Sequence, residues 1–493
     1  MIVDPGPWTL DVLVIGAGPA GCAAARLLAQ CGHQVLMIDR PAGDRHALAE
    51  SIPPSAQRVL SALGMRNAVD AAGFEPWLGN TVWWGLSAAR VEAFAPGEAG
   101  YQVERGRFDA LLRTLAAEAG VHIRSGRVHD VDPGVSATID SAGQTHIVTA
   151  RFMLDCSGRA GVIARKGLRV ADTSHRTVAL AGIWRAAQPW PDEQRGHTLV
   201  ASHADGWAWS VPTAPDTRYV TVMVDPERSH LTRGASSVEV YRAELAKVTP
   251  FTPFLNSAEP VDGPWGADAS LYGTRRHAGP GFLLVGDAAS FIDPLSSFGV
   301  KKALASGWLA AITANTVLTT PGMTEEAMSF FEQREQAVVA SFRQQAVQFA
   351  ADAVDGGNHP FWQARFAKPE DLDDGPDPAA LACDPAVLAA LDDLRRRPGI
   401  NLRQSDQVRT DLRPAIRGNV IVRQEHLFVP AWPVGIRYLR NIDLLTLVRL
   451  APDYRDVGDL YEAVLRASPG VSLPDFLGTL ATLIARGALR HEV

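Results

Sequence analysis

The sequence is poor in lysine and in cysteine. Only five of the 47 Lys and Arg residues in the 493-residue chain are lysines, and the first of them is Lys166. The four cysteines, Cys22, Cys31, Cys156 and Cys383, form no C-x-x-C pair and have no zinc-like spacing. This pattern excludes a thiolate metal site of the usual kind, and we expect no metal. It fits a reduced, cytoplasmic compartment.

Long apolar runs and an excess of one charge are also absent. No run reaches the roughly 18 apolar residues that a membrane-spanning helix needs, and the opening MIVDPGPWTLDVLVIG lacks the features of a signal peptide. The net charge of -7 gives no reason to expect a nucleic-acid partner. With 46% hydrophobic and 20% charged residues, the composition is that of a globular protein, and the length predicts two or three domains.

The first forty residues indicate a dinucleotide-binding unit. The apolar run DVLVI (11–15) predicts a buried strand, GAGPAG a tight turn, CAAARLLAQCG a helix and HQVLMIDR a second strand. Glycines in a G-x-G-x-x-G pattern allow the turn, a close approach to pyrophosphate and helix–strand packing, and the acid after the second strand suits ribose hydroxyls. The predicted residues of this site are Gly16, Gly18, Pro19, Ala20, Gly21, Asp39 and Arg40.

A second glycine-marked stretch, GPGFLLVGDAASFIDPLSSFGVKKALASGWLAA (279–311), predicts a strand, a Gly-Asp turn, a loop and a helix. It resembles the Gly-Asp motif of group A flavoprotein monooxygenases and their halogenase relatives. The resemblance implies that Asp287 binds the ribityl chain of FAD and that the following helix points its N-terminus at the isoalloxazine O2. The helix dipole would stabilise the negative charge of reduced flavin there.

Further segments carry the same resemblance in the same order. YQVERGRFDALLRTLAAEAGV (101–121) is similar to the family's V-x-R-x-x-F-D-x-L-L segment, and FMLDCSGRAG (152–161) to its D-x-S-G-R segment. AESIPPSAQRVLSALGM (49–65), FIDPLSSFG and WAWSVP resemble motifs of the halogenase-like branch. The resemblance implies FAD as the cofactor and adds these binding residues: Ser51, Arg105, Val128, Asp155, Gly158, Gly286, Asp287, Pro294, Ser297, Gly299 and Val300.

The predicted fold class is α/β, with a Rossmann-type FAD-binding domain, an inserted mixed β-sheet and a helical C-terminal module. The FAD-binding domain takes residues 1–79, 105–170 and 266–350, the substrate-side sheet 80–104 and 171–265, and the C-terminal extension 351–493. Helical runs from about residue 440 resemble a small winged-helix module. Its six Arg against seven acidic residues disfavour DNA binding, which leaves a packing appendage or a docking surface for a protein substrate.

One lysine is missing where the halogenase-like branch needs it. In the phenol-type halogenases a lysine in G-F-x-x-K-x-G-G-T-x-x-W-G holds or captures hypohalous acid beside the substrate. The corresponding stretch here is GFEPWLGNTVWWG (73–85), with Trp77 at the lysine position. Lys301 and Lys302 lie on the predicted flavin-binding helix instead. Phe298 also replaces a small residue beside the expected halide site.

These departures favour direct oxygen transfer over halogenation. The resemblance implies a flavin C4a-hydroperoxide, which then hydroxylates an electron-rich ring in a dry pocket. Aromatic side chains suit such a wall, although they could equally fill space beside the flavin domain. The candidates are Trp77, Trp83, Trp84, Trp207, Trp209 and Phe298. A distal acid or base is also needed, and spacing selects none among Glu50, Glu75, His203 and His277.

The sequence therefore predicts an FAD-dependent monooxygenase that hydroxylates an indole or phenol. NADH, NADPH or a flavin reductase would supply electrons. The substrate is an aromatic small molecule or a tryptophan side chain in a peptide or protein, as in the flavoproteins of tryptophylquinone biogenesis, which share this scaffold. Two alternatives remain at this point: a flavin-dependent halogenase with a relocated lysine, and an FAD-bound maturation scaffold or chaperone.

Overall fold

The chain divides into two compact units, Met1–Glu370 and Asp371–Val493, each of which is described by itself. The computed structural model describes residues 9–40, 48–85, 88–229, 231, 235–353, 359–365, 384–397 and 399–492. Within these residues no helix is long and apolar enough to cross a membrane.

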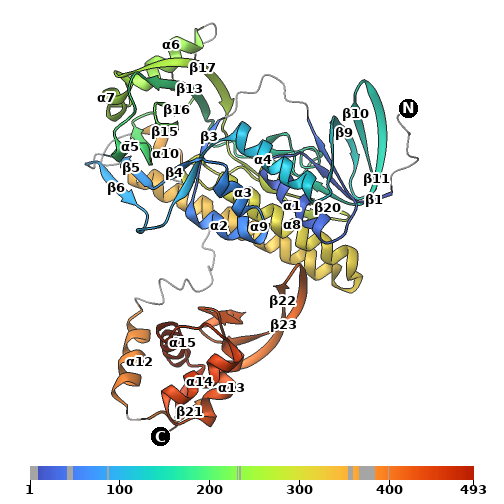
Figure 1. The fold of residues 1–493 in the computed structure, drawn as a ribbon, viewed down its shortest axis with the longest axis vertical. Helices are drawn as coiled ribbons and strands as arrows, with labels where there is room; N and C mark the ends of the chain where they lie inside the picture. Colours follow the sequence, from blue (N-terminus) through green and yellow to red (C-terminus); the bar gives the residue numbers. More distant parts are fainter. Residues whose placement is uncertain are drawn as a thin grey trace. The chain divides into compact units, whose positions relative to one another are not determined.

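An eight-stranded sheet with a parallel central part lies at one end of the first unit, on the right in Figure 1. Strand β1 (Thr9–Ile15) pairs with β2 (Val35–Asp39) and β11 (Gln144–Asp155), and these pair in turn with β8 (His122–Ser125) and β20 (Phe282–Leu284). All four pairings are parallel, so the carboxyl ends of the strands share one edge, where open α/β sheets bind their ligands. The Rossmann-type fold expected from the sequence is confirmed.

Helices α1 (Pro19–Gln30), α4 (Arg105–Glu118) and α8 (Gly299–Thr319) pack together in this unit. The contact between α1 and α8 depends on small residues. A Cβ on Gly307 would lie 2.3 Å from the carbonyl oxygen of Ala20, closer than any side chain allows. The strand–turn–helix pattern of the sequence thus produces two tightly packed helices, each of which directly follows a glycine-containing loop.

A seven-stranded sheet forms the second layer of this unit, in the order β17-β13-β16-β15-β14-β5-β6. Its strands are β5 (Gly79–Trp83), β6 (Arg90–Ala93), β13 (Val178–Ala186), β14 (His197–His203), β15 (Gly206–Ala214), β16 (Thr217–Val224) and β17 (Ala258–Asp268). Helix α6 (Ser237–Ala246) packs on β16 and β17. The sheet is mixed, as expected, because β14 pairs with β5 in parallel and its other neighbours run antiparallel.

Three short strands connect the two sheets. Strand β7 (Gly100–Glu104) pairs with β3 (Ala49–Ile52) and β4 (Glu75–Trp77) rather than with the seven-stranded sheet. The segment 80–104 is therefore shared between two sheets. Backbone pairing across about 50 residues decides this, and local sequence does not reveal it.

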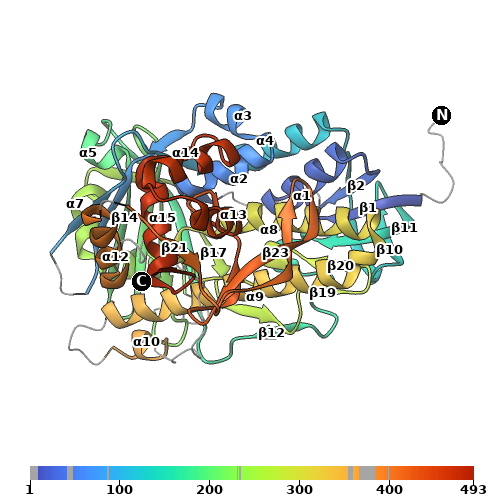
Figure 2. The same cartoon turned by 90° about the horizontal axis from the view of Figure 1, so that it is seen from below.

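Helix α9 (Thr324–Ala353) runs along the first unit from β19 (Ala278–Gly279) toward α10 (Pro360–Gln363), as Figure 2 shows. It contacts α8, the loop after β20 and α10. The first unit thus continues past residue 350, where the sequence predicts the start of a C-terminal extension. The predicted three-part division of the chain stays a prediction.

The second unit combines helices with short strands around one apolar core. Its main elements are α12 (Pro385–Arg396), β22 (Arg409–Arg417), β23 (Val420–Val429), β24 (Trp432–Ile436), α13 (Leu444–Leu450), α14 (Val457–Ala467) and α15 (Leu473–Ala485). Helices α13, α14 and α15 lie where the sequence predicts helical runs, whereas α12 and the strands were not predicted. The core also takes in Val387 from α12 and Leu427 from β23.

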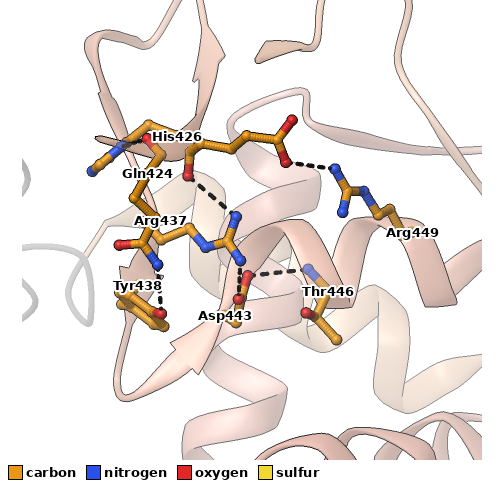
Figure 3. Close-up of polar contacts among 8 residues, drawn as sticks. Gln424, His426, Arg437, Tyr438, Asp443, Thr446 and Arg449 are labelled. Carbon is orange, nitrogen blue, oxygen red and sulfur yellow. Dashed lines mark hydrogen bonds and ion pairs between the residues drawn. The ribbon is translucent and has the colours of Figure 1, made fainter. Parts of the chain in front are cut away.

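Arg437 connects strand β23 of this unit to helix α13 (Figure 3). Arg437 donates to the backbone oxygen of Glu425, at 3.1 Å, and to the Asp443 carboxylate. Asp443 in turn caps α13 by accepting from the N–H of Thr446, at 3.1 Å. The carboxylate therefore satisfies a helix N-terminus and a half-buried guanidinium together.

Candidate active site

The glycine turn after β1 leaves one position open. A Cβ on Gly16, whose φ is +103°, would lie 2.5 Å from the Cys156 oxygen, and a Cβ on Gly21 would lie 1.9 Å from the Gly16 oxygen. A Cβ on Gly18 would meet no atom within 4 Å. The first turn of α1, with Pro19 and Ala20, holds no acidic residue and no side-chain cap. Its N–H groups and dipole therefore suit a phosphate beside Gly18, as FAD requires.

The end of β2 presents a carboxylate at the same sheet edge. Asp39 is about one-third exposed, and its Oδ2 lies 3.6 Å from an Arg113 nitrogen. Arg40 follows and is exposed. Val128, on β9 (Arg127–Asp132), belongs to the apolar core instead, so only its backbone could meet a ligand. This arrangement fits the ribose and adenine contacts that the sequence predicts.

The Gly286–Asp287 turn follows β20 and precedes the second helix terminus. Gly286 has a φ of +61°, and the Tyr272 hydroxyl donates to the Asp287 backbone oxygen at 2.6 Å. After the loop of Pro294 and Ser297, α8 begins at Gly299. A Cβ on Gly299 would meet nothing within 4 Å. The start of α8 carries no acidic residue and no side-chain cap, and Val300 is buried, so this end also suits an anionic group.

Arg105, a predicted cofactor-binding residue, is held by two carboxylates. Arg105 makes two hydrogen bonds to Asp109, at 3.0 and 2.9 Å, and lies 3.5 Å from Glu50. Burial raises the pKa of Glu50, while Arg105 opposes the rise and Asp287 adds to it. The Arg105 guanidinium therefore lies between the carboxylates of Asp109 and Glu50. A pyrophosphate contact for Arg105 stays a prediction.

Other predicted cofactor residues point into the protein. Asp155 is fully buried and accepts from Ile163 N, at 2.7 Å, and from the Ser157 backbone and hydroxyl. It shapes the turn in which Gly158 adopts a φ of +60°. The Ser51 hydroxyl lies 2.6 Å from that of Thr198. Asp155 and Ser51 thus organise the walls of the site through their side chains.

Three of the predicted pocket tryptophans lie together. Trp207 and Trp209 stack with ring centroids 4.7 Å apart, because alternate residues of β15 share a face. Trp84 belongs to the same cluster, as do Phe291 and Leu295 from the loop before α8. This aromatic cluster, defined by these five residues together with Phe361 and Trp362 of α10, joins the seven-stranded sheet to the loop between β20 and α8, which we call the flavin loop.

Two members of the cluster were missed by the sequence analysis. Phe361 and Trp362 on α10 are buried in it, and the Trp362 ring lies 5.2 Å from that of Trp84. The Trp362 N–H donates to the His203 backbone oxygen at 2.9 Å. An adjacent aromatic pair in a Pro- and Asp-rich stretch was the available signal.

The remaining predicted pocket residues lie elsewhere. Trp77, 4% exposed, packs edge-on against Phe94 at 5.0 Å and donates to the Gly79 oxygen at 2.7 Å. Trp83 packs near Phe251 on the opposite face from Trp84. Phe298 lies 5.5 Å from the Phe342 ring. Trp77, Trp83 and Phe298 therefore do not join the other predicted pocket residues in one wall.

The candidate acids and bases are dispersed as well. Glu50 lies 3.5 Å from Arg105, whereas His277 is buried beside α9, where its backbone N–H donates to Glu332 at 2.6 Å. Glu75 lies on β4, the short strand that also carries Trp77. His203 closes β14 beside the aromatic cluster. Among the described residues, no three His, Cys, Asp or Glu side chains are grouped to hold a metal ion.

His203 should make the protein acid-sensitive. Burial, with Lys247 adding to it, lowers the pKa of His203 to about 4. In the unfolded chain it returns to about 6.5, so the unfolded state binds the proton first as the pH falls. Between these values stability should fall by about 1.4 kcal/mol per pH unit from this residue.

A His203→Gln variant isolates this contribution, because the other histidines remain in both proteins. Urea unfolding at about pH 7 and about pH 5 should show a smaller loss of stability for the variant. Parallel pH dependence in the two proteins would show that His203 is not held neutral by the fold.

Two family models match the chain. The tryptophan halogenase model matches residues 88–374, and the pyridine nucleotide-disulphide oxidoreductase model matches residues 10–153. Tryptophan 2-halogenase of Chondromyces crocatus is 32% identical over 355 residues, which cover 68% of each protein. Flavin-dependent halogenase armH3 of Armillaria mellea is 29% identical over 370 residues, covering 68% of this chain and 73% of that protein.

Two solved structures are similar over nearly the whole chain. The flavin-dependent halogenase CmlS has a TM-score of 0.77 at 24% identity and covers 98% of this chain and 96% of its own, which shows a shared fold. QhpG, a peptidyl tryptophan dihydroxylase essential for tryptophylquinone cofactor biogenesis, has a TM-score of 0.67 at 25% identity. It covers 97% of this chain and 100% of its own. Both likenesses extend through the second compact unit.

Proposed function

The chain belongs to the tryptophan halogenase family of flavin-dependent oxidoreductases, and on this premise we propose that it is an FAD-dependent monooxygenase that hydroxylates an aromatic ring. The observation that carries the proposal is Trp77. Trp77 occupies the position at which the motif of the phenol-type halogenases has a lysine. Its indole is buried, hydrogen-bonded and packed on Phe94. No ammonium can occupy that position.

Of the five lysines of the chain, only Lys301 is a candidate to replace the missing one. Lys166 pairs with Asp130 at 3.1 Å, and Lys247 pairs with Glu244 at 2.8 Å. Lys302 is buried against the Gly-Asp turn, and Lys368 lies outside the described residues. Lys301 alone lies beside the flavin loop, with its Nζ 4.7 Å from the Phe298 ring centroid.

The proposed substrate is an indole or phenol, with a tryptophan side chain of a peptide or protein as the leading candidate. The similarity to the peptidyl tryptophan dihydroxylase along the full length of both chains supports this choice. Stacked indoles such as Trp207 and Trp209 suit an indole ring. A docking role for the second unit stays a prediction.

The residues of the chain have three tasks in this proposal. The open space at Gly18 and Gly299 and the two helix termini hold the cofactor. FAD, when bound and reduced, supplies the activated oxygen. The aromatic cluster excludes water, so that oxygen is transferred to the ring and not lost as peroxide. Glu50, 3.5 Å from Arg105 and with a pKa that Asp287 helps to raise, is the candidate acid or base.

Product analysis tests the proposal. The FAD-loaded protein would be supplied with indoles, phenols and tryptophan-containing peptides, using NADH, NADPH or a flavin reductase as the electron source, with and without bromide. We expect a product heavier by oxygen alone, formed equally well without halide. Absence of any substrate-dependent consumption of oxygen, together with tight binding of a protein partner, would instead favour a maturation scaffold.

A halogenase that uses Lys301 is the second candidate. Burial lowers the pKa of Lys301, and Arg58 adds to that effect, so a neutral amine is more accessible there than on the surface. The variants Lys301→Met and Lys166→Met remove a lysine at the flavin loop and at the surface, respectively. We expect an oxygenated product from wild type and from both variants in bromide. A brominated wild-type product that only Lys301→Met loses would establish the halogenase.

A further inference from the structure

Lys302 is buried beneath the Gly286–Asp287 turn. Its side chain is 1% exposed, although it belongs to the second turn of α8, whose start faces the proposed flavin site. The Nζ atom donates to the Gly286 oxygen at 3.3 Å, to the Asp287 carboxylate at 3.4 Å and to the Ser290 oxygen. The Lys302 ammonium thus donates to three acceptors within the five-residue segment 286–290.

A second residue of α8 holds the same turn. Ser306 follows Lys302 by four residues, so the two side chains share a face of the helix. The Ser306 hydroxyl accepts from the Gly286 N–H at 2.9 Å, while Lys302 donates to the Gly286 oxygen. Both polar groups of the Gly286 peptide unit are therefore tied to α8, and the turn is fixed relative to the helix.

A second buried ionisable group, on α9, lies near this ammonium, whose ion-pair partner is Asp287 at 3.4 Å. Glu335 is 3% exposed, and burial raises its pKa, which the nearby Lys302 opposes. Moving a charge out of water is costly unless partners compensate for the lost hydration. An apolar side chain could fill this space on α8 without that cost. The charge of Lys302 is therefore explained better by its hydrogen bonds to the Gly286–Asp287 turn than by packing.

We propose that Lys302 is a positioning residue that locks the Gly286–Asp287 turn so that the Asp287 carboxylate faces the ribityl chain of FAD. This inference rests on the proposed FAD-binding function. Lys302 acts through Asp287 and through the backbone of residues 286–290, without touching the substrate.

The test compares Lys302→Met, Glu335→Gln and the double variant with wild type, and Lys166→Met controls for the loss of a surface charge. FAD affinity is measured by titrating the apo protein, and thermal unfolding of the apo protein is measured in parallel. Lys302→Met should weaken FAD binding by at least about tenfold, because a charged hydrogen-bond donor to three acceptors is lost. It should also unfold at a lower temperature, since Glu335 loses a nearby positive charge.

The double variant separates positioning from stability. Removing both charges should restore the apo unfolding temperature while FAD binding stays weak, and amide exchange of residues 286–290 should be faster than in wild type. If the double variant recovers FAD affinity together with stability, the proposal is overturned, and the role of Lys302 is structural only. Failure of the wild-type protein itself to bind FAD would refute the proposed function instead, whereas equal binding by wild type and Lys302→Met would refute only this inference.

Discussion

Replacing Gly18 with alanine should abolish FAD binding without changing the stability of the apo protein. The backbone at Gly18 has a φ of -79°, which any residue adopts, and a Cβ there would meet no protein atom within 4 Å. The methyl group would instead occupy the space at the N-terminus of α1 that the pyrophosphate needs. We expect affinity to fall by at least about a hundredfold, the loss that follows from displacing two or more charge-assisted hydrogen bonds.

Gly21→Ala is the matched control, three residues away in the same motif. Its Cβ would lie 1.9 Å from the Gly16 oxygen, so the backbone must move, and we expect the apo protein to lose about 1–3 kcal/mol or more. Titration with FAD and urea unfolding of both variants distinguish the two effects. A Gly18→Ala protein that binds FAD as tightly as wild type would show that the cofactor does not lie beside this turn.

Trp77→Lys, which restores the halogenase residue type, should destabilise the protein severely and should not create a halogenase. The indole is 4% exposed, donates to the Gly79 oxygen and packs against Phe94, so the variant loses a large apolar contact. Such losses cost about 3–5 kcal/mol, and an unpaired buried ammonium adds to them.

Trp77→Phe keeps most of the apolar contact and should lose much less stability. Urea unfolding of both variants, followed by product analysis in bromide, makes the test. A Trp77→Lys protein as stable as wild type that forms a brominated product would mean that the site needs nothing but a lysine, contrary to our account.

The glycine motifs were the most predictable part of this protein. GAGPAG between two apolar runs predicts β1, α1 and β2, because only glycine satisfies the positive φ at Gly16 and the contact at Gly21. The Gly-Asp stretch likewise predicts β20, the turn and α8. Local steric requirements of this kind are written in the residues themselves.

Side-chain partners across the fold were less predictable. Arg105 lies on α4, and its pairing with Glu50 on β3 depends on how these elements meet. The alternation of a strand predicts that Trp83 and Trp84 face opposite sides, but it does not tell which side meets the flavin loop. Trp362 reaches the cluster through α10, more than 150 residues from its partner His203. Such contacts depend on tertiary packing, which one sequence does not specify locally.

The central claim is that the enzyme transfers oxygen to an aromatic ring, whereas its halogenase relatives transfer halide. The most direct test is a reaction under ¹⁸O₂ in the presence of chloride and bromide, with a tryptophan-containing peptide as substrate and mass spectrometry of the product. We predict a product that carries ¹⁸O and no halogen. A product with a chlorine or bromine isotope pattern and no ¹⁸O would contradict the account.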